Sequence, residues 1–312
     1  MSDFPRPTVV VSRCLEFEAV RYDGRRIPDD FIRRLESLVT YVPVCPEIEI
    51  GLGVPRDPIR LVRVGKGERL VQPATGRELT REMTRFAKRF LDRRADLDGF
   101  ILKSRSPSCG TRDVKVHPDA EATEAIGRRA GVFAAAVLHR FPDLAVENED
   151  RLGDLRLREH FLTKLFALAR LRGVERSGHR SELVRFHEAH RLLLLAYHRT
   201  QSRALDRLMA SANGTPFPEL AARYRERFGS ALRRPPRSSS AVRVARQVAE
   251  HLSDRLGREE RARLGAAVRA YRERRLPVGA LSDILRSWAA RFPDQELRDQ
   301  AFLDPYPAAL RR

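Results

Sequence analysis

Residues 8–14 read Thr-Val-Val-Val-Ser-Arg-Cys, a short apolar run that ends in a cysteine at a turn. A valine-rich run of this length is typical of a strand buried on both faces of a sheet. Two later stretches repeat the pattern: residues 42–47 read Val-Pro-Val-Cys-Pro-Glu, and residues 99–103, Gly-Phe-Ile-Leu-Lys, lead into Ser-Pro-Ser-Cys-Gly at 106–110. Each of the chain's three cysteines, Cys14, Cys45 and Cys109, therefore follows an extended apolar run.

The sequence around these runs alternates between strand and helix patterns through residue 150. Apolar segments predict strands at 9–11, 39–44, 59–64, 69–71 and 100–102, and helical spacing of apolar residues predicts helices at 30–38, 80–97 and 121–139. The strands at 59–64 and 69–71 are expected to form a hairpin. This alternation indicates an α/β domain with a mostly parallel sheet and flanking helices. Ligands of such folds bind beyond the carboxyl ends of the strands, where all three cysteines are expected.

Beyond about residue 155 the pattern is almost wholly helical. Periodic segments lie near 156–172, 181–211, 217–233, 241–256, 259–274 and 278–292. A chain of 312 residues is longer than one typical domain. We therefore expect two domains, an α/β domain over 1–150 and an all-α domain over 151–312, with the aromatic and proline-rich tail at 300–307 packed back onto the second.

The charge of the chain is concentrated in its second half. Residues 1–150 carry 26 Lys and Arg against 24 Asp and Glu, a net of +2, whereas residues 151–312 carry 34 against 18, a net of +16. A basic domain indicates a polyanionic partner, either nucleic acid or an anionic membrane. Arginine bias from a GC-rich genome is the alternative explanation, but that bias would raise both halves equally.

The sequence predicts no association with a membrane. The first residues lack a basic segment followed by an apolar stretch, and no run reaches the 18 or more apolar residues of a membrane span. We expect a cytoplasmic protein, in which disulfides are disfavoured.

Three thiols at the ends of strands either pack separately or share one metal. A shared centre with three cysteines has an open position, which suits a 4Fe–4S cluster with one free iron, or a zinc ion completed by a histidine such as His117. The spacing alone leaves both choices open.

The residues beside the cysteines are those that water activation requires. Glu47 follows Cys45, Ser106 and Ser108 precede Cys109, and Lys103 and Arg105 lie on the same loop. A carboxylate, hydroxyls and basic groups beside an open metal site suit the attack of water on a metal-held substrate. Each also has a plainer interpretation: a surface or capping carboxylate, serines of a turn, and solvated loop charges.

Four histidines in the second half invite a metal assignment. They are His179, His187, His190 and His198, of which His187 and His190 share a helix face. No set of carboxylates accompanies them, so we interpret them as structural or RNA-contacting.

Taken together, these segments resemble the thiouracil desulfidase family over residues 8–150. Five motifs occur in order: Ser-Arg-Cys-Leu at 12–15, Arg-Tyr-Asp-Gly at 21–24, Cys-Pro-Glu at 45–47, Gly-Leu-Gly-Val-Pro-Arg at 51–56, and Leu-Lys at 102–103 leading to Ser-Pro-Ser-Cys-Gly at 106–110. The second half resembles the YbgA-type domain often fused to that family. The segments that carry this second resemblance are Arg-Phe-His-Glu-Ala-His at 185–190, Tyr-His at 197–198 and Phe-Leu-Asp-Pro-Tyr-Pro at 302–307.

The resemblance implies a 4Fe–4S cluster held by Cys14, Cys45 and Cys109, with the fourth iron open to a thiocarbonyl sulfur. It implies a non-redox, hydrolytic desulfidase that returns 4-thiouridine in tRNA to uridine and releases sulfide. It also implies roles for an acidic residue, matched by Glu47, and for a serine, matched equally by Ser106 and Ser108.

Other functions remain open from the sequence. The substrate could be free thiouracil or a thiolated nucleotide, or the chain could be a non-catalytic RNA-binding or redox-sensing protein. The sequence predicts no particular oligomeric state.

Overall fold

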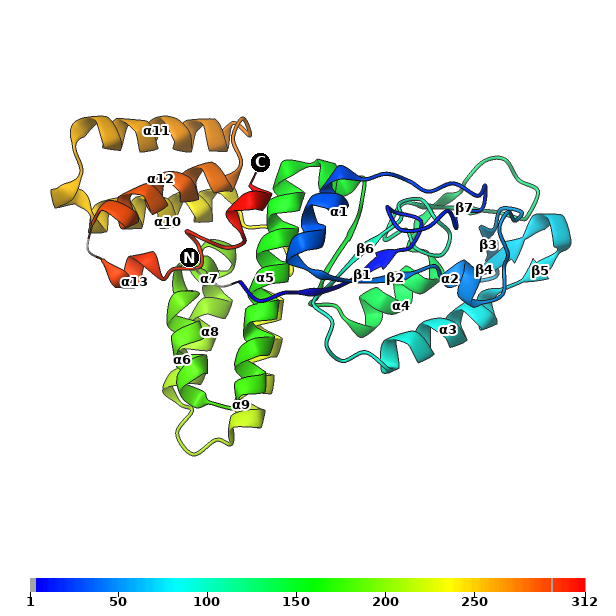
Figure 1. The fold of residues 1–312 in the computed structure, drawn as a ribbon, viewed down its shortest axis with the longest axis horizontal. Coiled ribbons are helices and arrows are strands. Elements are labelled where there is room, and N and C mark those ends of the chain that lie inside the picture. The colour runs from blue at the N-terminus through cyan, green and yellow to red at the C-terminus, as the bar shows by residue number, and fades with distance from the viewer. Residues whose placement is uncertain (1–3, 293, 312) are drawn as a thin grey trace. The chain divides into compact units, whose positions relative to one another are not determined.

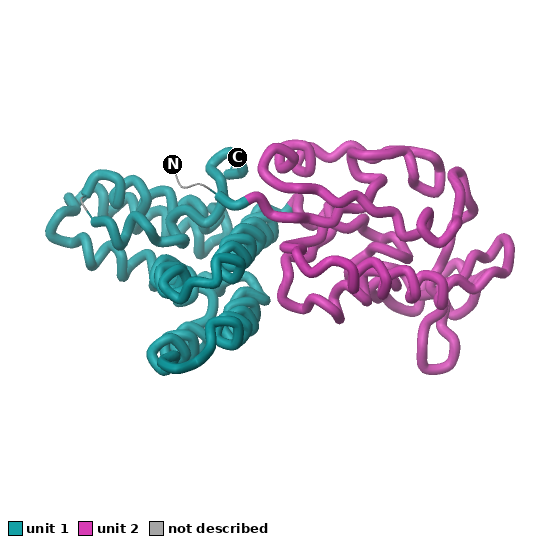
Figure 2. Tube along the Cα trace, turned by 60° about the horizontal axis from the view of Figure 1, so that its bottom comes forward, with its two compact units in different colours: residues 1–5, 154–312 teal, residues 6–153 magenta. Residues whose placement is uncertain are grey.

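The computed structural model describes residues 4–292 and 294–311, and the chain divides into two compact units (Figure 2). The N-terminal unit is Arg6–Gly153, and the helical unit is Asp154–Arg312 together with Met1–Pro5. None of the helices in the described ranges is long and apolar enough to cross a membrane.

A parallel sheet of four strands lies at the centre of the N-terminal unit. Its order is β2-β1-β6-β9, with β1 at Thr8–Ser12, β2 at Thr40–Val44, β6 at Gly99–Leu102 and β9 at Ala145–Asn148 (Figure 1). All three pairings are parallel, and Val9, Val10 and Val11 are fully buried. The predicted fold class is confirmed, although β9 was not predicted.

A second sheet of five strands has the order β5-β4-β3-β7-β8. Its strands are β3 at Arg60–Val64, β4 at Gly67–Gln72, β5 at Arg77–Glu78, β7 at Val114–His117 and β8 at Gly127–Arg129. The predicted hairpin of β3 and β4 is confirmed. The remaining strands were not predicted, and the only parallel pair in this sheet joins β3 to β7.

The helices of this unit are shorter than the sequence predicted. They are α1 at Asp30–Leu35 with a 3-10 turn at Glu36–Leu38, α2 at Pro46–Glu49, α3 at Thr80–Asp92 and α4 at Val132–Arg140, with further 3-10 turns at Pro73–Thr75 and Arg151–Gly153. On α3 and α4, Phe86, Phe90 and Phe133 pack against one another.

The predicted helix at 121–139 is wrong in its first half. The Asp119 carboxylate accepts hydrogen bonds from the amides of Glu121 and Ala122, which forms a turn instead of a helix. The Ile126 amide then donates to the Val116 carbonyl, and the chain continues as β8. The Asp119 turn and the antiparallel pairing of β8 with β7 therefore prevail over the local helix propensity. The helix predicted at 80–97 likewise ends at Asp92, before the loop that leads into β6.

The helical unit contains no strand within the described residues. Its helices are α5 at Leu155–Ser177, α6 at Arg180–Ala189, α7 at Arg191–Tyr197, α8 at Arg199–Ala210, α9 at Phe217–Ala231, α10 at Ser238–His251, α11 at Arg258–Arg272, α12 at Val278–Arg291 and α13 at Gln295–Arg298, with 3-10 turns at Ser253–Arg255 and Ala308–Leu310 (Figure 1). The stretch predicted as one segment at 181–211 is three helices. The breaks fall at His190 and His198, whose backbones leave the helical conformation.

The C-terminal tail packs back onto the helical unit, as predicted. Phe302, Leu303 and Tyr306 are buried. The Asp304 carbonyl accepts a hydrogen bond from Arg170 at 3.2 Å, and the Ala301 amide donates to the Ala189 carbonyl at 2.8 Å. The sequence predicted an extended segment here, whereas the structure forms a series of turns.

Candidate active site

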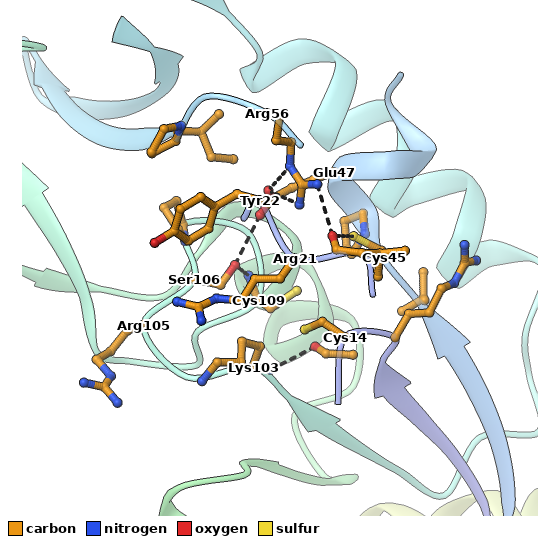
Figure 3. Close-up of a pocket in the computed structure, with 18 of the residues that line it drawn as sticks. Cys14, Arg21, Tyr22, Cys45, Glu47, Arg56, Lys103, Arg105, Ser106 and Cys109 are labelled. Carbon is orange, nitrogen blue, oxygen red and sulfur yellow. Dashed lines mark hydrogen bonds and ion pairs between the residues drawn. The ribbon is translucent and has the colours of Figure 1, made fainter. Parts of the chain in front are cut away.

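The three cysteines line one cavity of about 370 Å³ in the N-terminal unit, which we call the cysteine pocket (Figure 3). Cys14 follows β1, Cys45 follows β2, and Cys109 lies in the loop after β6. Because these three strands are adjacent and parallel, their carboxyl ends lie at one edge of the sheet. The placement expected from the sequence is therefore observed.

The cysteine loops are held by local backbone contacts. Cys45 precedes α2, whose first residue is Pro46, a residue suited to the first helical position. The Cys109 loop is closed by a hydrogen bond from the Gly110 amide to the Ser106 carbonyl at 2.9 Å. It presses against Gly131 at the start of α4, where a Cβ atom would lie 2.6 Å from the Pro107 carbonyl oxygen. Glycine is needed there because no side chain fits.

The environment of the three thiols suits a soft metal group. Burial, with the neighbouring Cys45, raises the pKa of Cys14 to about 12, and burial also raises the pKa of Cys45 and of Cys109. Three adjacent thiolates would repel one another in this setting, and a positively charged metal group would remove that cost. The donor set therefore fits an iron–sulfur cluster.

The ligation itself stays a prediction. Among the described residues, no group of three or more His, Cys, Asp or Glu side chains is arranged to hold a metal ion. The zinc alternative that uses His117 finds no support in the placement of that residue. His117 lies on β7 and is absent from the lining of the cysteine pocket.

The predicted acid–base residues meet at a single carboxylate oxygen. Glu47 Oε1 accepts hydrogen bonds from Ser108 Oγ at 3.0 Å and from Ser106 Oγ at 3.4 Å. Ser106 lines the cysteine pocket, whereas Ser108 is fully buried and does not line it. The structure therefore separates two serines that the sequence could not: Ser106 faces the cavity, and Ser108 supports Glu47 from behind.

Arg56 is the functional candidate that sequence reasoning missed. Its Nε and its Nη2 lie 2.9 Å and 2.8 Å from Glu47 Oε2, and both side chains are largely buried (Figure 3). Arg56 also donates to the carbonyls of Val20 and Gly53. This clamp fixes the Glu47 carboxylate, because one oxygen binds the guanidinium and the other faces the serines. The sequence did contain a signal for this residue, because Arg56 is the last residue of the family motif at 51–56.

Lys103 is not the solvated loop charge that one interpretation offered. Its ammonium pairs with the Glu149 carboxylate and lies 2.9 Å from Ser104 Oγ. Glu149 also accepts from the Ser104 amide at 2.6 Å, and the Lys103 amide donates to Ser12 Oγ at 2.9 Å. These contacts link the β6 loop to β1 and to the chain after β9. Glu149 was not singled out from the sequence.

Arginine and tyrosine side chains lie at the rim of the pocket. The Arg21 guanidinium lies 5.0 Å from the centre of the Tyr22 ring and 3.2 Å from the Asp23 carboxylate. Arg105 has a left-handed backbone with a φ of 59°, and its amide donates to Asp113 Oδ2 at 3.0 Å. Its side chain points away from the cysteines (Figure 3). An aromatic ring among cations suits a planar, anionic ligand.

The four histidines of the helical unit do not come together. His187 contacts the hydroxyl of Tyr224 at 3.1 Å and the carboxylate of Asp206 at 3.2 Å. His190 Nδ1 lies 2.7 Å from the Phe186 carbonyl. His179 and His198 precede α6 and α8 as N-caps. These contacts match the structural interpretation.

Comparison with known proteins finds a matching family model for each part of the chain. A family model described as 2-thiouracil desulfurase matches residues 9–149, and one described as a protein of unknown function, DUF1722, matches residues 191–307. The uncharacterized protein YbbK of Bacillus subtilis (strain 168) is 31% identical over 111 residues, which is 33% of this chain and 73% of YbbK. A solved structure titled 4Fe-4S-dependent thiouracil desulfidase TudS is 29% identical, with a TM-score of 0.39 over 49% of this chain and 97% of that chain.

Proposed function

We propose that this chain, which belongs to the 2-thiouracil desulfurase family, converts 4-thiouridine in tRNA to uridine. Membership makes the chain a desulfidase, an enzyme that removes sulfur from a thiouracil ring. The observation that carries the proposal is one pocket lined by Cys14, Cys45, Cys109, Glu47 and Ser106, in a chain whose other half has a net charge of +16.

Cys14, Cys45 and Cys109 are proposed to hold a 4Fe–4S cluster. When bound, such a cluster supplies a thiophilic Lewis acid that draws electron density from a C=S bond. The chain's own residues supply the rest of the site. Carbon–sulfur cleavage by water exchanges sulfur for oxygen and releases sulfide, so no oxidant or reductant is consumed.

Glu47 is proposed to take the proton of the attacking water. Its carboxylate borders the pocket, and Arg56 holds it in one orientation through Oε2. Ser106 Oγ lies 3.4 Å from the other oxygen and accepts from the Cys109 amide at 3.2 Å. Ser106 can therefore pass a proton between Glu47 and the base. Ser108 keeps Glu47 in reach of Ser106.

The helical unit is proposed to bind the RNA backbone. Arg199, Arg203 and Arg207 lie four residues apart on α8 and are all exposed. Like charges at this spacing destabilise a helix, and none of the three forms an ion pair with a described residue. A polyanion along this row would remove the repulsion and add affinity that depends on salt.

Free thiouracil or a thiolated nucleotide is the second candidate substrate. It is favoured by the fact that every residue lining the cysteine pocket belongs to the N-terminal unit.

The test is desulfuration by the full-length protein after anaerobic reconstitution with iron and sulfide. Thiolated bulk tRNA and free 4-thiouracil are offered in parallel, and nucleosides are measured by mass spectrometry. Loss of 4-thiouridine with gain of uridine supports the proposal. If cluster-loaded protein acts on free 4-thiouracil and leaves tRNA untouched, the second candidate replaces the first.

The RNA-binding part has a separate test. Replacing Arg199, Arg203 and Arg207 with Gln is expected to weaken tRNA binding and to lower the slope of log affinity against log salt by about 2–3. The matched control replaces three exposed cations of the N-terminal unit, Lys66, Arg81 and Arg85. An unchanged slope in the α8 variant would remove α8 from the RNA-binding surface.

A further inference from the structure

The loop between β6 and Cys109 determines where Ser106 lies. Ser106 Oγ accepts a hydrogen bond from the Cys109 amide at 3.2 Å, and the Ser106 carbonyl accepts from the Gly110 amide at 2.9 Å. These contacts join Ser106 to the backbone that follows it. The position of its hydroxyl beside Glu47 therefore depends on the conformation of the three preceding residues, 103–105.

Arg105 has a backbone conformation that is unfavourable for its residue type. Its φ of 59° lies in the left-handed region, where the Cβ atom of an ordinary residue is crowded and glycine is favoured. Its side chain is exposed and points away from the cysteines (Figure 3). Strained residues persist only where the surrounding structure holds them. Contacts made by the backbone must therefore keep Arg105 in this conformation.

Two carboxylates supply these contacts. Asp113 Oδ2 accepts a hydrogen bond from the Arg105 amide at 3.0 Å, and Glu149 Oε2 accepts from the Ser104 amide at 2.6 Å. Glu149 Oε1 also accepts from Ser104 Oγ at 2.8 Å, and the Glu149 side chain is only 8% exposed. Glu149 therefore fixes Ser104, and Asp113 holds the one residue between Ser104 and Ser106.

Asp113 is built into the loop at a cost to stability. A Cβ atom on Gly110 would lie 2.6 Å from Asp113 Oδ1 and 3.2 Å from the Arg105 nitrogen, so the carboxylate fills the space inside the loop. Asp113 Oδ1 is buried and forms no hydrogen bond with the described residues. A buried polar atom without a partner destabilises the folded state. Stability does not explain an acidic side chain in this place, which points to a role in function.

Asp113 acts from outside the cysteine pocket. It lines a neighbouring cavity of about 440 Å³, which is also lined by Arg105 and His117, and it is absent from the lining of the cysteine pocket. The Asp113 carboxylate therefore reaches a base held beside the cysteines only through the loop that it supports.

We propose that Asp113 is a positioning residue for desulfuration, which keeps Arg105 in the left-handed conformation and thereby holds the Ser106 hydroxyl beside Glu47. The proposal rests on the proposed function, since it takes Ser106 as the group that passes the proton. Asp113 serves as a hydrogen-bond acceptor at a fixed position. An asparagine oxygen can accept the same amide hydrogen, so the charge of Asp113 is not required.

The first test compares kcat and KM for free 4-thiouracil in the cluster-loaded, full-length protein. Asp113→Ala should lower kcat by roughly 10-fold to 100-fold, the cost of displacing a reacting group by about 1 Å. The change in KM should be smaller, and iron and sulfide content should match the wild type. Asp113→Asn should recover most of the lost kcat.

The matched control for this test is Asp119→Ala. The Asp119 carboxylate also accepts hydrogen bonds from backbone amides, those of Glu121 and Ala122, but it does not line the cysteine pocket. Its kcat should equal that of the wild type. An equal loss of kcat in Asp113→Ala and Asp119→Ala overturns the proposal.

The second test relieves the strain at residue 105. Glycine adopts the left-handed conformation without the Cβ penalty, which corresponds to a factor of roughly 5 to 30. R105G/D113A should therefore have a kcat several-fold higher than R105A/D113A, up to that factor, although both variants lack the same guanidinium. With Asp113 present, R105G and R105A should have the same kcat. A glycine that restores kcat no better than alanine overturns the proposal.

Amide hydrogen exchange provides a measurement that needs no turnover. In Asp113→Ala, peptides that cover residues 103–113 should exchange faster than in the wild type, and the rest of the N-terminal unit should be unchanged. In Asp119→Ala, the segment 103–110 should exchange as in the wild type. Exchange of this segment that is the same in all three proteins contradicts the positioning role.

The proposed function can fail separately. If the wild type acts on free 4-thiouracil and leaves tRNA untouched, the tRNA assignment fails and the positioning role stands. If Ser106→Ala retains the wild-type kcat, the proton transfer proposed for Ser106 fails, and the positioning role fails with it. If Ser106→Ala loses activity and Asp113→Ala does not, only the positioning role fails.

Discussion

The N-terminal unit and the helical unit use buried polar side chains differently. Around the cysteine pocket, Glu47 and Ser106 contact each other and also border a cavity. In the helical unit, His187 and Tyr224 contact each other inside the core, where both are buried. A buried polar residue therefore indicates chemistry only when part of its hydrogen-bonding capacity faces a space that a ligand can enter.

The two units also differ in their net charge and in where their cations lie. The N-terminal unit has nearly balanced charges, and its cations at 105, 115 and 128 gather at one cavity beside the pocket. The excess of positive charge belongs to the helical half, where a row of exposed arginines runs along α8. The contrast predicts that RNA binding to the helical unit depends on salt.

The largest effect is expected from the cysteines, all of which belong to the N-terminal unit. Replacing Cys14, Cys45 or Cys109 with Ser should abolish cluster binding and desulfuration, because these three residues are the only cysteines in the sequence and so the only source of thiolate ligands. Iron and sulfide per chain, measured after anaerobic reconstitution, test this. Thermal unfolding of the helical unit should be unchanged. Full iron content in any of the three variants would contradict the assigned ligands.

Glu47→Gln should lower kcat by roughly 10²–10⁴-fold, the usual contribution of a positioned general base. The amide cannot take a proton from water, although it can still contact Arg56 and the serines. Cluster content should match the wild type. The control is Glu175→Gln in the helical unit, which breaks an ion pair with Arg225 and should leave kcat unchanged.

The two serines allow a residue that lines the pocket to be compared with one that only supports Glu47. Ser106→Ala should lower kcat by about 10-fold to 100-fold, the value of one hydrogen bond to a charged group. Ser108→Ala should reduce kcat less, because its hydroxyl reaches only Glu47 and does not line the pocket. Steady-state rates on free 4-thiouracil decide the order. The reverse order would make Ser108 the catalytic serine.

Glu159 should give the helical unit a stability that depends on pH. Burial raises its pKa from its ordinary value of 4.5 to about 7, although the amides of Val278 and Gly279 donate to its carboxylate. Between pH 4.5 and about 7, the Glu159 carboxyl therefore keeps its proton in the folded state and has lost it in the unfolded state. The resulting stabilisation is fully present below pH 4.5 and is lost as the pH rises to about 7. It is on the order of 3 kcal/mol.

Urea unfolding across this pH range, followed by circular dichroism, measures that loss. In Glu159→Gln the contribution should vanish, and its unfolding free energy should vary less between the two pH values. A wild-type profile that the substitution leaves unaltered would contradict the assignment.

Tyr224→Phe should have the smallest effect. It removes the hydroxyl that contacts His187 Nδ1 at 3.1 Å and leaves that nitrogen buried. The cost is about 1–3 kcal/mol of unfolding free energy, measured in urea. Desulfuration of free 4-thiouracil should be unaffected. A fall in kcat at full stability would show that the core of the helical unit also serves the chemistry.

Local sequence determined the elements that follow strong patterns. The valine run at 9–11 became a buried strand of a parallel sheet, and each cysteine follows the strand expected. The second sheet was missed in part, because β7 and β8 are short strands and β7 pairs with β3, which is distant in the chain. His117 shows the same limit, since its sequence position beyond Cys109 gave no sign that it faces a different cavity.

By itself, the sequence determined the α/β and helical parts, the basic second half, the three thiols and the acidic and hydroxyl residues near them, because periodicity, charge and composition are local properties. Three features became visible only in the fold: Arg56 clamps Glu47, Ser106 faces the pocket while Ser108 lies behind it, and Lys115 opposes Arg128. Such contacts are decided by how loops and strands far apart in sequence are brought together, and local pattern does not encode that geometry.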